Sequence, residues 1–442
     1  MYLRNFDRFF SPLQWQIILK TAQIASDLNL RAFAVGGIVR DAIVIKKIRS
    51  NFFYKDLDLV FDCAENAGIR VAIALHDLFP ESKLQIHEKF QTAELLWQDF
   101  AMDMATARHE TYAFAGANPQ VTATTLEEDL WRRDFTVNAL AVELDPQFGI
   151  RGEVIDRFNG LEDLANKQVR AIRAGSFAED PRRLFRAARF AIRLDFSIAP
   201  ETYAEITATT SSGLHDAIGG ARLRSEIIYT LAEPKAAEMF DLLQEFGALR
   251  CIHPNLWLTN DLTNSFGRQY RRSQFWMKLL GRLENKSYSP TQLGLELLLS
   301  YLPHQISTVL DLGLTPEQKI RQVKLAHLFA EMPKLANLSI KATEIAKILQ
   351  KFDTQTLILA GAKCEPTHRR ILWLYLMKWQ FVKAPLTGED LKQIGYSAGK
   401  QIGEILQRLR WAALDGEIKT KDEAIAYLQI LGEESKANIS SS

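Results

Sequence analysis

Two aspartates that stand two residues apart are the strongest indication of chemistry in this 442-residue sequence. Asp56 and Asp58 belong to the alternating segment KDLDLVFD, and in a β-strand both side chains point to the same face. Neighbouring carboxylates repel each other unless a cation lies between them or one is protonated. Because Mg²⁺ binds one or two carboxylates together with phosphate oxygens of a substrate, the pair predicts metal-assisted phosphoryl chemistry. A strand with solvated acids is the alternative.

Two glycines upstream of these aspartates predict a phosphate-binding turn. Gly36 and Gly37 follow the apolar segment 33–35, and the residues after them, including Arg40, have helical spacing. A strand that passes through two glycines into a helix exposes backbone N–H groups and the positive end of the helix dipole. An ordinary strand–helix turn explains the glycines alone, but their position before the paired aspartates favours a functional site.

Asp103 is a candidate third carboxylate. It stands in a β-like segment, FAMDMATAR, whose neighbours Met102 and Met104 face the opposite side of the strand. We expect it to join Asp56 and Asp58, although a solvated acid at a strand end would give the same pattern.

Four arginines lie on one face of a helix predicted over residues 181–194. Their spacings of four, three and four residues bring the guanidinium groups together, so they need protein acids or a polyanion such as a triphosphate or RNA. Asp180 is a possible N-cap of this helix, while Ser176 and Glu179 form a competing capping box. A bend is therefore predicted near Pro181. The arginines are Arg182, Arg186, Arg189 and Arg193.

The elements that position these residues predict a mixed α and β region followed by helices. An amphipathic helix with Ser11 as its possible N-cap extends to Leu28, and β-like runs occupy residues 84–103. Residues 109–125 are rich in Gly, Asn, Pro and Thr and predict an exposed, mobile loop. The next helix starts after Thr124 or Thr125, and its Arg132 and Arg133 point in different directions. The mixed pattern ends near residue 156, and the chain is helical from residue 161 almost to its end.

Composition is that of an ordinary globular protein with two to four domains, because 47% of the residues are hydrophobic and 24% are charged. The formal net charge of +1 predicts no strong overall attraction to nucleic acid, so any RNA contact must come from local patches. Three distant cysteines, Cys63, Cys251 and Cys364, argue against a disulfide framework or a zinc site and fit the cytoplasm. We expect neither a secretory signal nor a membrane-spanning segment.

Taken together, several motifs resemble those of the class II nucleotidyltransferases, which comprise tRNA CCA-adding enzymes and bacterial poly(A) polymerases. The resemblance is strong over residues 31–230, patchy over 240–380, and strong again near the C-terminal end. It implies an α+β fold in which a small mixed-sheet head of the polymerase-β-like nucleotidyltransferase type precedes an all-α remainder. The motifs, in order, are VGGIVRD with KDLDLVFD, LEEDLWRRDFTVNALAVEL, EDPRRLFRAARFAIRLDF, GGARLRSEI and LTGEDLKQIGYSAGKQIGEIL.

The resemblance implies a role for each candidate residue. Asp56 and Asp58 would hold the Mg²⁺ ions, and Asp103 would be the third catalytic carboxylate. Asp180 and Arg183 would present hydrogen-bonding groups to the incoming base, so that protein acts as the template. The implied nucleotide-binding residues are Gly36, Gly37, Arg40, Arg133, Asp180, Arg183, Arg186 and Arg189.

The resemblance also implies an organisation and an activity. Residues 1–155 would form the catalytic head, 156–245 a helical neck with the nucleotide-selecting motif, 246–350 a helical body and 351–442 a tRNA-binding tail. The implied reaction adds C and/or A from CTP and ATP to the tRNA 3′ end and releases pyrophosphate. The implied partner is tRNA, held by its acceptor and T arms.

Three alternatives stay open. The chain could add all of CCA, only CC or only the terminal A. It could be a poly(A) polymerase, although the segment HEKF at residues 87–90 lacks the Arg-Arg-Phe-like signature of those enzymes and favours tRNA repair. It could also be an inactive RNA-binding protein on the same scaffold, but the intact Asp56, Asp58 and Arg133 argue against this. The connection between Asp41 and Asp56 is longer than the family's, and its role is open.

Overall fold

The computed structural model describes most of the chain and divides it into two compact units. The first unit comprises Met1–Leu258 with Leu310–Leu312, and the second comprises Thr259–Val309 with Gly313–Ser442. In residues 260–265 and 431–440 only the backbone is described. Most of the long connection before Asp56, Cys63 and the middle of the predicted loop lie outside the described residues. Those described are 1–3, 6–44, 53–62, 64–111, 120–213, 220–253, 256, 260–302, 312–335, 341–397 and 399–440.

A mixed β-sheet forms the centre of the first unit, as the sequence predicts. The strand order is β10–β9–β2–β3–β6–β5–β4, with β12 also paired to β9. Among the described strands of this sheet, only β3 and β6 run parallel to each other. The strands are β2 (Ala32–Val35), β3 (Asp56–Phe61), β4 (Lys83–His87), β5 (Thr92–Trp97), β6 (Phe100–Thr106), β9 (Leu140–Asp145), β10 (Gly149–Ile150) and β12 (Ile155–Asp156).

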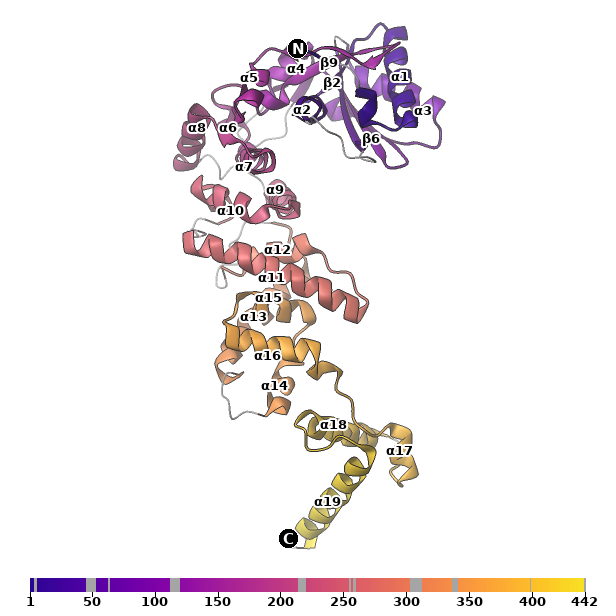
Figure 1. Ribbon diagram of the computed structural model, residues 1–442, viewed down its shortest axis with the longest axis vertical. Helices are drawn as coiled ribbons and strands as arrows, with labels where there is room; N and C mark the ends of the chain where they lie inside the picture. The colour runs from indigo at the N-terminus through magenta and orange to yellow at the C-terminus, as the bar shows by residue number, and fades with distance from the viewer. Residues whose placement is uncertain are drawn as a thin grey trace. The chain divides into compact units, whose positions relative to one another are not determined.

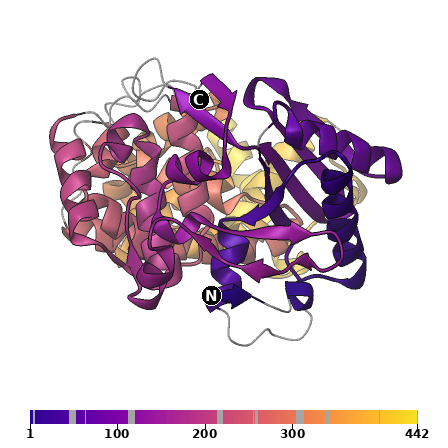
Figure 2. The ribbon, with the colours of Figure 1, turned by 90° about the horizontal axis from the view of Figure 1, so that it is seen from above.

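Alternating side chains give the sheet one apolar face and one face that carries the acids. Leu57, Leu59 and Phe61 are buried, whereas Asp56 and Asp58 are exposed, which confirms the predicted alternation. Helices α1 (Pro12–Asp27) and α3 (Ala67–Leu78) contact each other and cover strands of the sheet (Figure 1, Figure 2). Ser11 caps α1 in a capping box with Gln14, as its sequence predicts.

Short helices follow the sheet within the first unit. The predicted bend near Pro181 is confirmed, because α6 ends at Glu179 and α7 begins at Arg182. A small parallel pair, β13 (Gln168–Val169) with β14 (Ser197–Ile198), shows that β structure continues beyond residue 156, contrary to the prediction. The helices are α2 (Gly37–Val44), α4 (Leu126–Trp131), α5 (Gly160–Ala165), α6 (Ser176–Glu179), α7 (Arg182–Leu194), α8 (Pro200–Ser211), α9 (Gly220–Ala232) and α10 (Ala236–Glu245).

Two local predictions around α4 and α6 were wrong. The predicted loop over residues 109–125 contains paired strands, β7 (Arg108–Thr111) and β8 (Gln120–Ala123). Neither Ser176 nor Asp180 is an N-cap. The N-cap of α6 is Gly175, and that of α7 is Pro181. The Ser176 hydroxyl accepts from the side chain of Arg183 instead. Asp180 accepts from the backbone N–H of Arg182 at 3.2 Å and also from its guanidinium, so it still binds one donor at the start of α7.

The described part of the second unit is entirely helical. Helix α15 contacts both α11 and α16 (Figure 1). Gly361 of α15 permits this packing, because a Cβ there would lie 2.1 Å from the Trp276 ring. No helix among the described residues is long and apolar enough to cross a bilayer. The helices are α11 (Asn260–Glu284), α12 (Pro290–Leu299), α13 (Pro316–Leu335), α14 (Ala342–Leu349), α15 (Thr354–Lys363), α16 (Pro366–Met377), α17 (Gly388–Gln393), α18 (Lys400–Leu414) and α19 (Lys421–Ser440).

Candidate active site

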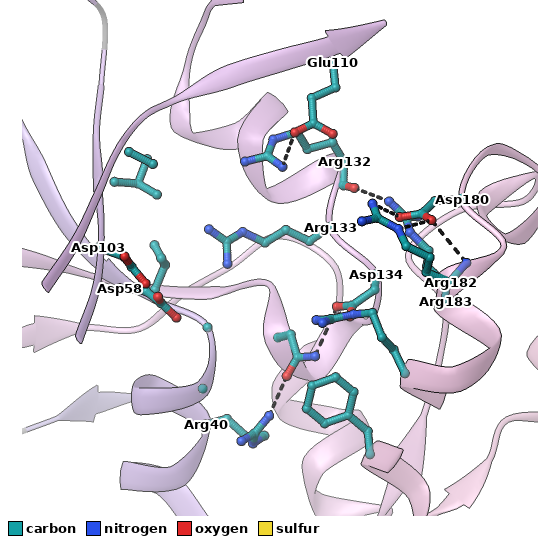
Figure 3. Close-up of a pocket in the computed structure, with 18 of the residues that line it drawn as sticks. Arg40, Asp58, Asp103, Glu110, Arg132, Arg133, Asp134, Asp180, Arg182 and Arg183 are labelled. Carbon is teal, nitrogen blue, oxygen red and sulfur yellow. Dashed lines mark hydrogen bonds and ion pairs between the residues drawn. The ribbon is translucent and has the colours of Figure 1, made fainter. Parts of the chain in front are cut away.

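One cavity of about 550 Å³ in the first unit gathers most of the predicted site residues (Figure 3). Asp56 and Arg189 are the two predicted residues that do not line it. The cavity lies between the acid-bearing face of the sheet, the start of α2, the end of α4 and helix α7. The predicted residues that line it are Gly36, Gly37, Arg40, Asp58, Asp103, Arg133, Asp180, Arg183 and Arg186.

Asp58 and Asp103 lie side by side at the wall of this cavity. Parallel pairing of β3 with β6 places Asp58 directly opposite Asp103, so both carboxylates stand on the same face of the sheet. Asp56 lies on that face as well, two residues earlier in β3. Burial, together with the negative charges of Asp58, Glu94 and Asp56, raises the pKa of Asp103 to about 6. The structure thus places Asp103 beside Asp58, as we expected from the sequence, and its catalytic role stays a prediction.

The acids supply the donor chemistry that a hard cation needs, but they are not assembled as a closed metal site. The pKa of Asp58, whose side chain stands at the cavity wall, is raised overall: partial loss of solvent raises it, Arg133 lowers it and the charge of Asp56 raises it. Added positive charge would therefore stabilise this group of carboxylates. Carboxylate oxygens are ligands that Mg²⁺ prefers. However, no three His, Cys, Asp or Glu side chains in the described ranges are placed to hold a metal ion. Metal binding by Asp56 and Asp58 stays a prediction.

The glycine turn brings the start of α2 to the cavity. Gly36 has a positive φ of 73°, and a Cβ there would lie 3.2 Å from Nη1 of Arg133 and 3.9 Å from Oδ2 of Asp58. The positive φ favours glycine, and a Cβ there would also require the Arg133 guanidinium to move by a few tenths of an ångström. The N–H of Gly36 donates to the Leu140 carbonyl, which ties the turn to β9. The first-turn N–H groups of α2, which begins at Gly37, have no intrahelical acceptor and remain for an anion.

Arg132 and Arg133 both bind the carboxylate of Asp129, and their side chains point in different directions, as predicted. Asp129 accepts from Nη2 of Arg132 at 2.6 Å and from Nη2 of Arg133 at 3.1 Å. Burial alone would raise the pKa of Asp129, but the two arginines lower it. Arg132 then reaches Glu110 at 2.9 Å, whereas Arg133 extends toward Asp58 (Figure 3). Only Arg133 is therefore directed at the paired acids.

Asp180 and Arg183 both line the cavity, but each contacts other groups. Nε and Nη2 of Arg182 donate to the two carboxylate oxygens of Asp180 at 2.7 and 2.8 Å. Arg183 donates to the Ser176 hydroxyl and, at 2.6 Å, to the Arg132 carbonyl. The predicted base-reading groups are present in one cavity, and Arg182 neutralises the acidic one.

A chain of hydrogen bonds that the sequence did not predict joins α2 to α7. Arg40 donates from Nη1 to Oδ1 of Asn138 at 2.6 Å, and Nδ2 of Asn138 donates to Asp134 at 3.1 Å. Asp134 also accepts from Nε of Arg186 at 2.6 Å. Asp134 and Asn138 lie within the segment LEEDLWRRDFTVNALAVEL, so the motif pointed to this region but not to their roles.

Of the five arginines of α7, the four that the sequence places on one face are neutralised by protein acids, which answers the question raised by their spacing. Arg189 binds Glu226 of α9 and is buried, so it does not reach the cavity. Phe190, also missed by sequence analysis, lies among the guanidinium groups of Arg40, Arg186 and Arg193 at 5.3, 5.4 and 5.8 Å from its ring centre. The acid partners are Asp180 for Arg182, Asp134 for Arg186, Glu226 for Arg189 and Glu233 for Arg193.

Comparison with known families identifies two matching regions. Residues 32–170 match a family described as the poly A polymerase head domain. Residues 195–258 match one described as a probable RNA and SrmB-binding site of polymerase A. The first region contains the glycine turn, the paired acids and Arg133, and α7 lies between the two.

Similar proteins extend the match over nearly the whole chain. An A-adding tRNA nucleotidyltransferase of Geobacter sulfurreducens is 30% identical over 91% of this chain and 45% of its own length. One from Halalkalibacterium halodurans is 26% identical, covering 93% of this chain and 91% of its own. The chain thus spans about half the length of the Geobacter relative. A solved tRNA-processing enzyme with CTP is 26% identical with a TM-score of 0.68, covering 89% of this chain and 100% of that one.

Proposed function

We propose that this chain is a member of the family of class II tRNA nucleotidyltransferases and bacterial poly(A) polymerases and that it adds C and/or A to the 3′ end of tRNA. Its matches to the poly A polymerase head domain and to A-adding tRNA nucleotidyltransferases support this proposal. CTP and ATP are the nucleotide donors, and pyrophosphate is the second product. The observation that carries the proposal is a single cavity that holds Asp58 beside Asp103, a glycine turn, Arg133 and the Asp180/Arg183 pair.

The reaction is a nucleotidyl transfer from a triphosphate to an RNA hydroxyl. The 3′-hydroxyl oxygen forms a bond to the α-phosphorus while the bond between that phosphorus and the β-bridging oxygen breaks. Arg133 and the first turn of α2 bind the phosphates and orient them for this displacement. Asp56 and Asp58 would hold a divalent ion such as Mg²⁺, which would polarise the phosphoryl oxygens and lower the pKa of the attacking hydroxyl.

Selection of C and A follows from the chemistry of Asp180 and Arg183. Cytosine and adenine both present an exocyclic amine next to a ring nitrogen that accepts a hydrogen bond. A carboxylate accepts from the amine and a guanidinium donates to the ring nitrogen, so one pair of side chains serves both bases. Uracil and guanine place a carbonyl oxygen where the amine would be, which opposes the carboxylate.

The proposal is tested with purified protein and three tRNA transcripts that end in the discriminator base, in C and in CC. Incorporation of labelled CMP and AMP identifies CCA, CC or A addition, and the names of both similar proteins favour A addition to the CC transcript. We expect Asp58→Ala to lower incorporation by a factor of about a thousand or more, because the reacting phosphate loses its charge stabilisation. tRNA binding by this variant should be nearly unchanged. Incorporation into none of the three transcripts by the wild-type protein would refute the tRNA assignment.

Two other functions give different outcomes in the same assay. Long A tails on RNA without a tRNA fold would indicate a poly(A) polymerase, and tRNA binding without any incorporation would indicate an inactive RNA-binding protein. We infer that residues 1–155 act as the catalytic head, 156–245 as the neck, and 246–350 and 351–442 as a body and tail that hold the tRNA. We place this activity in the cytoplasm, because three cysteines that stand far apart in the sequence, Cys63, Cys251 and Cys364, fit a reducing compartment.

A further inference from the structure

One face of α11, in the second unit, presents three cations and an aromatic ring in a line. Arg271, Phe275, Lys278 and Arg282 follow one another at spacings of four, three and four residues, so they share a side of the helix. All four are exposed to solvent, and Phe275 is 60% exposed. The row extends about 17 Å along the helix axis at 1.5 Å per residue.

The three cations of this row form no ion pair within the part of the chain that the structure describes. Unpaired positive charge along one line favours a ligand with repeated negative charges over a single small anion. Three other exposed lysines of this unit, by contrast, pair with a carboxylate three residues earlier in the same helix. Such pairs are Lys334 with Glu331, Lys347 with Glu344 and Lys392 with Glu389.

The aromatic ring of the row belongs to a shallow cavity between α11 and α16. Phe275 stacks on Trp373, with ring centres 6.1 Å apart and planes at 17°, and Trp373 also contacts Trp276 at 5.1 Å. The outer face of Phe275 is left open by this arrangement. The cavity has a volume of about 310 Å³ and is lined by Phe275, Trp276, Pro366, Arg369, Arg370 and Trp373, with no carboxylate among them.

Positive charge accumulates around these rings. Arg369 is fixed by hydrogen bonds to backbone carbonyls, whereas Arg370, one residue later, is exposed. Burial and the neighbouring charges of Arg369 and Arg268 lower the pKa of Arg272, which lies beside Arg271. Stacking surfaces flanked by guanidinium groups are the arrangement that binds unpaired nucleobases together with their phosphates.

We propose that this surface, which we call the α11 face (Arg271, Phe275, Lys278 and Arg282 with Arg370 and Trp373 of α16), binds a single RNA strand. One unpaired base stacks on the open side of Phe275, and the cations contact the phosphates on either side of it. Stacking is independent of base identity, so the surface accepts any unpaired nucleotide. The inference rests on the proposed function only in that RNA is the substrate, and it adds a contact outside the catalytic cavity.

The stacking contact is tested by fluorescence anisotropy with the full-length protein. The probe is a labelled 12-nucleotide single-stranded RNA of mixed sequence, whose 3′-phosphate prevents extension. Phe275→Ala should raise its Kd by about tenfold, within the range for loss of one stacked base. Phe275→Leu, which keeps apolar area but has no π face, should behave like Ala, and Phe275→Trp should behave like the wild type. Phe381→Ala is the matched control, because Phe381 is 48% exposed in the same unit.

The charge contacts are tested by the salt dependence of the same binding. Each of Arg271→Ala, Lys278→Ala and Arg282→Ala should reduce the slope of log K against log salt by about 0.7, as expected for one lost phosphate contact to a single strand. Lys351→Ala removes an exposed charge elsewhere in this unit and should leave the slope unchanged.

Unchanged binding by Phe275→Ala would overturn the proposal, and so would wild-type binding by Phe275→Leu, which would indicate an apolar protein-docking surface. Incorporation into tRNA is measured on the same preparations. If the wild-type protein adds no nucleotide but RNA binding still depends on Phe275, the proposed function fails and the α11 face stands. If nucleotides are added but Phe275 has no effect on RNA binding, the proposed function stands and the RNA-binding role of the α11 face fails.

Discussion

At the scale of single residues, both oxygens of Asp180 are engaged by Arg182. In the proposed function, the amine of a cytosine or adenine therefore competes with Arg182 for the carboxylate oxygens of Asp180. Arg182 is 35% exposed and can swing away, whereas Asp180 is 13% exposed and is held beside the start of α7. Arg182 thus competes with the base for Asp180. A base that has a carbonyl oxygen in place of the exocyclic amine cannot displace Arg182.

We predict that Arg182→Met strengthens binding of the base, because Asp180 no longer has a competing partner. The loss of one positive charge also weakens attraction of a triphosphate, so Arg193→Met is the matched control. Arg193 is 46% exposed, lines the same cavity and pairs with Glu233 rather than with Asp180. The Kd of ATP and CTP, measured by calorimetry, should be about twofold to fivefold lower in Arg182→Met than in Arg193→Met. Equal affinities in the two variants would remove this role from Arg182.

At the scale of helices and strands, the sequence predicted the features that depend on neighbouring residues. The cap at Ser11, the bend at Pro181 and the alternation in β3 each depend on residues within a few positions. The β7–β8 pair was missed because its two strands, RHET and QVTA, carry few apolar residues and show no alternating apolar pattern. The parallel register that pairs Asp58 with Asp103 joins residues 45 positions apart, so spacing could suggest it but not establish it. Asp134 and Asn138 were missed because the residues of α2 and α7 that they contact are also far away in the sequence.

Glu110 shows how β7 is attached to the end of α4. Its carboxylate, 9% exposed, accepts from Nε of Arg108 at 3.0 Å and from Nη1 of Arg132 at 2.9 Å. We predict that Glu110→Ala lowers the free energy of unfolding by about 3 kcal/mol, because two poorly solvated arginines lose a partner. Glu143→Ala is the control, because its pair with Arg31 is largely exposed and should contribute less than about 1 kcal/mol. Urea unfolding measures both, and similar losses would contradict the assignment.

At the scale of the whole molecule, a net charge of +1 conceals two concentrations of positive charge. One lies in the cavity of the first unit, where protein acids neutralise the arginines of α7. The other is the α11 face of the second unit, whose row of three cations has no acid partner in the described ranges. The expectation that RNA contacts come from local patches is consistent with this division.

Stability of the second unit should depend on the protonation of Lys363. Its Nζ donates to the carbonyl and hydroxyl of Ser300 at 2.7 and 2.9 Å, and burial lowers its pKa to about 8. An unfolded lysine titrates near 10.4, so the unfolded chain binds more protons between pH 8 and that value. The unfolding free energy of the wild type, relative to Lys363→Met, should therefore rise by about 2 kcal/mol from pH 7 to pH 9.5. Urea unfolding at the two pH values measures this, and a constant difference would mean that Lys363 keeps an ordinary pKa.

The amide of Asn138 connects two walls of the cavity through groups of opposite character. Its oxygen accepts a hydrogen bond from Arg40 of α2, and its nitrogen donates one to Asp134. Asp134 in turn accepts a hydrogen bond from Arg186 of α7. An aspartate at position 138 would place its carboxylate next to that of Asp134, and the two would repel each other. A leucine there would leave the Arg40 guanidinium and the Asp134 carboxylate without this hydrogen-bonding partner. One amide therefore links the start of α2, where we propose that phosphates bind, to α7, where we propose that the base is selected.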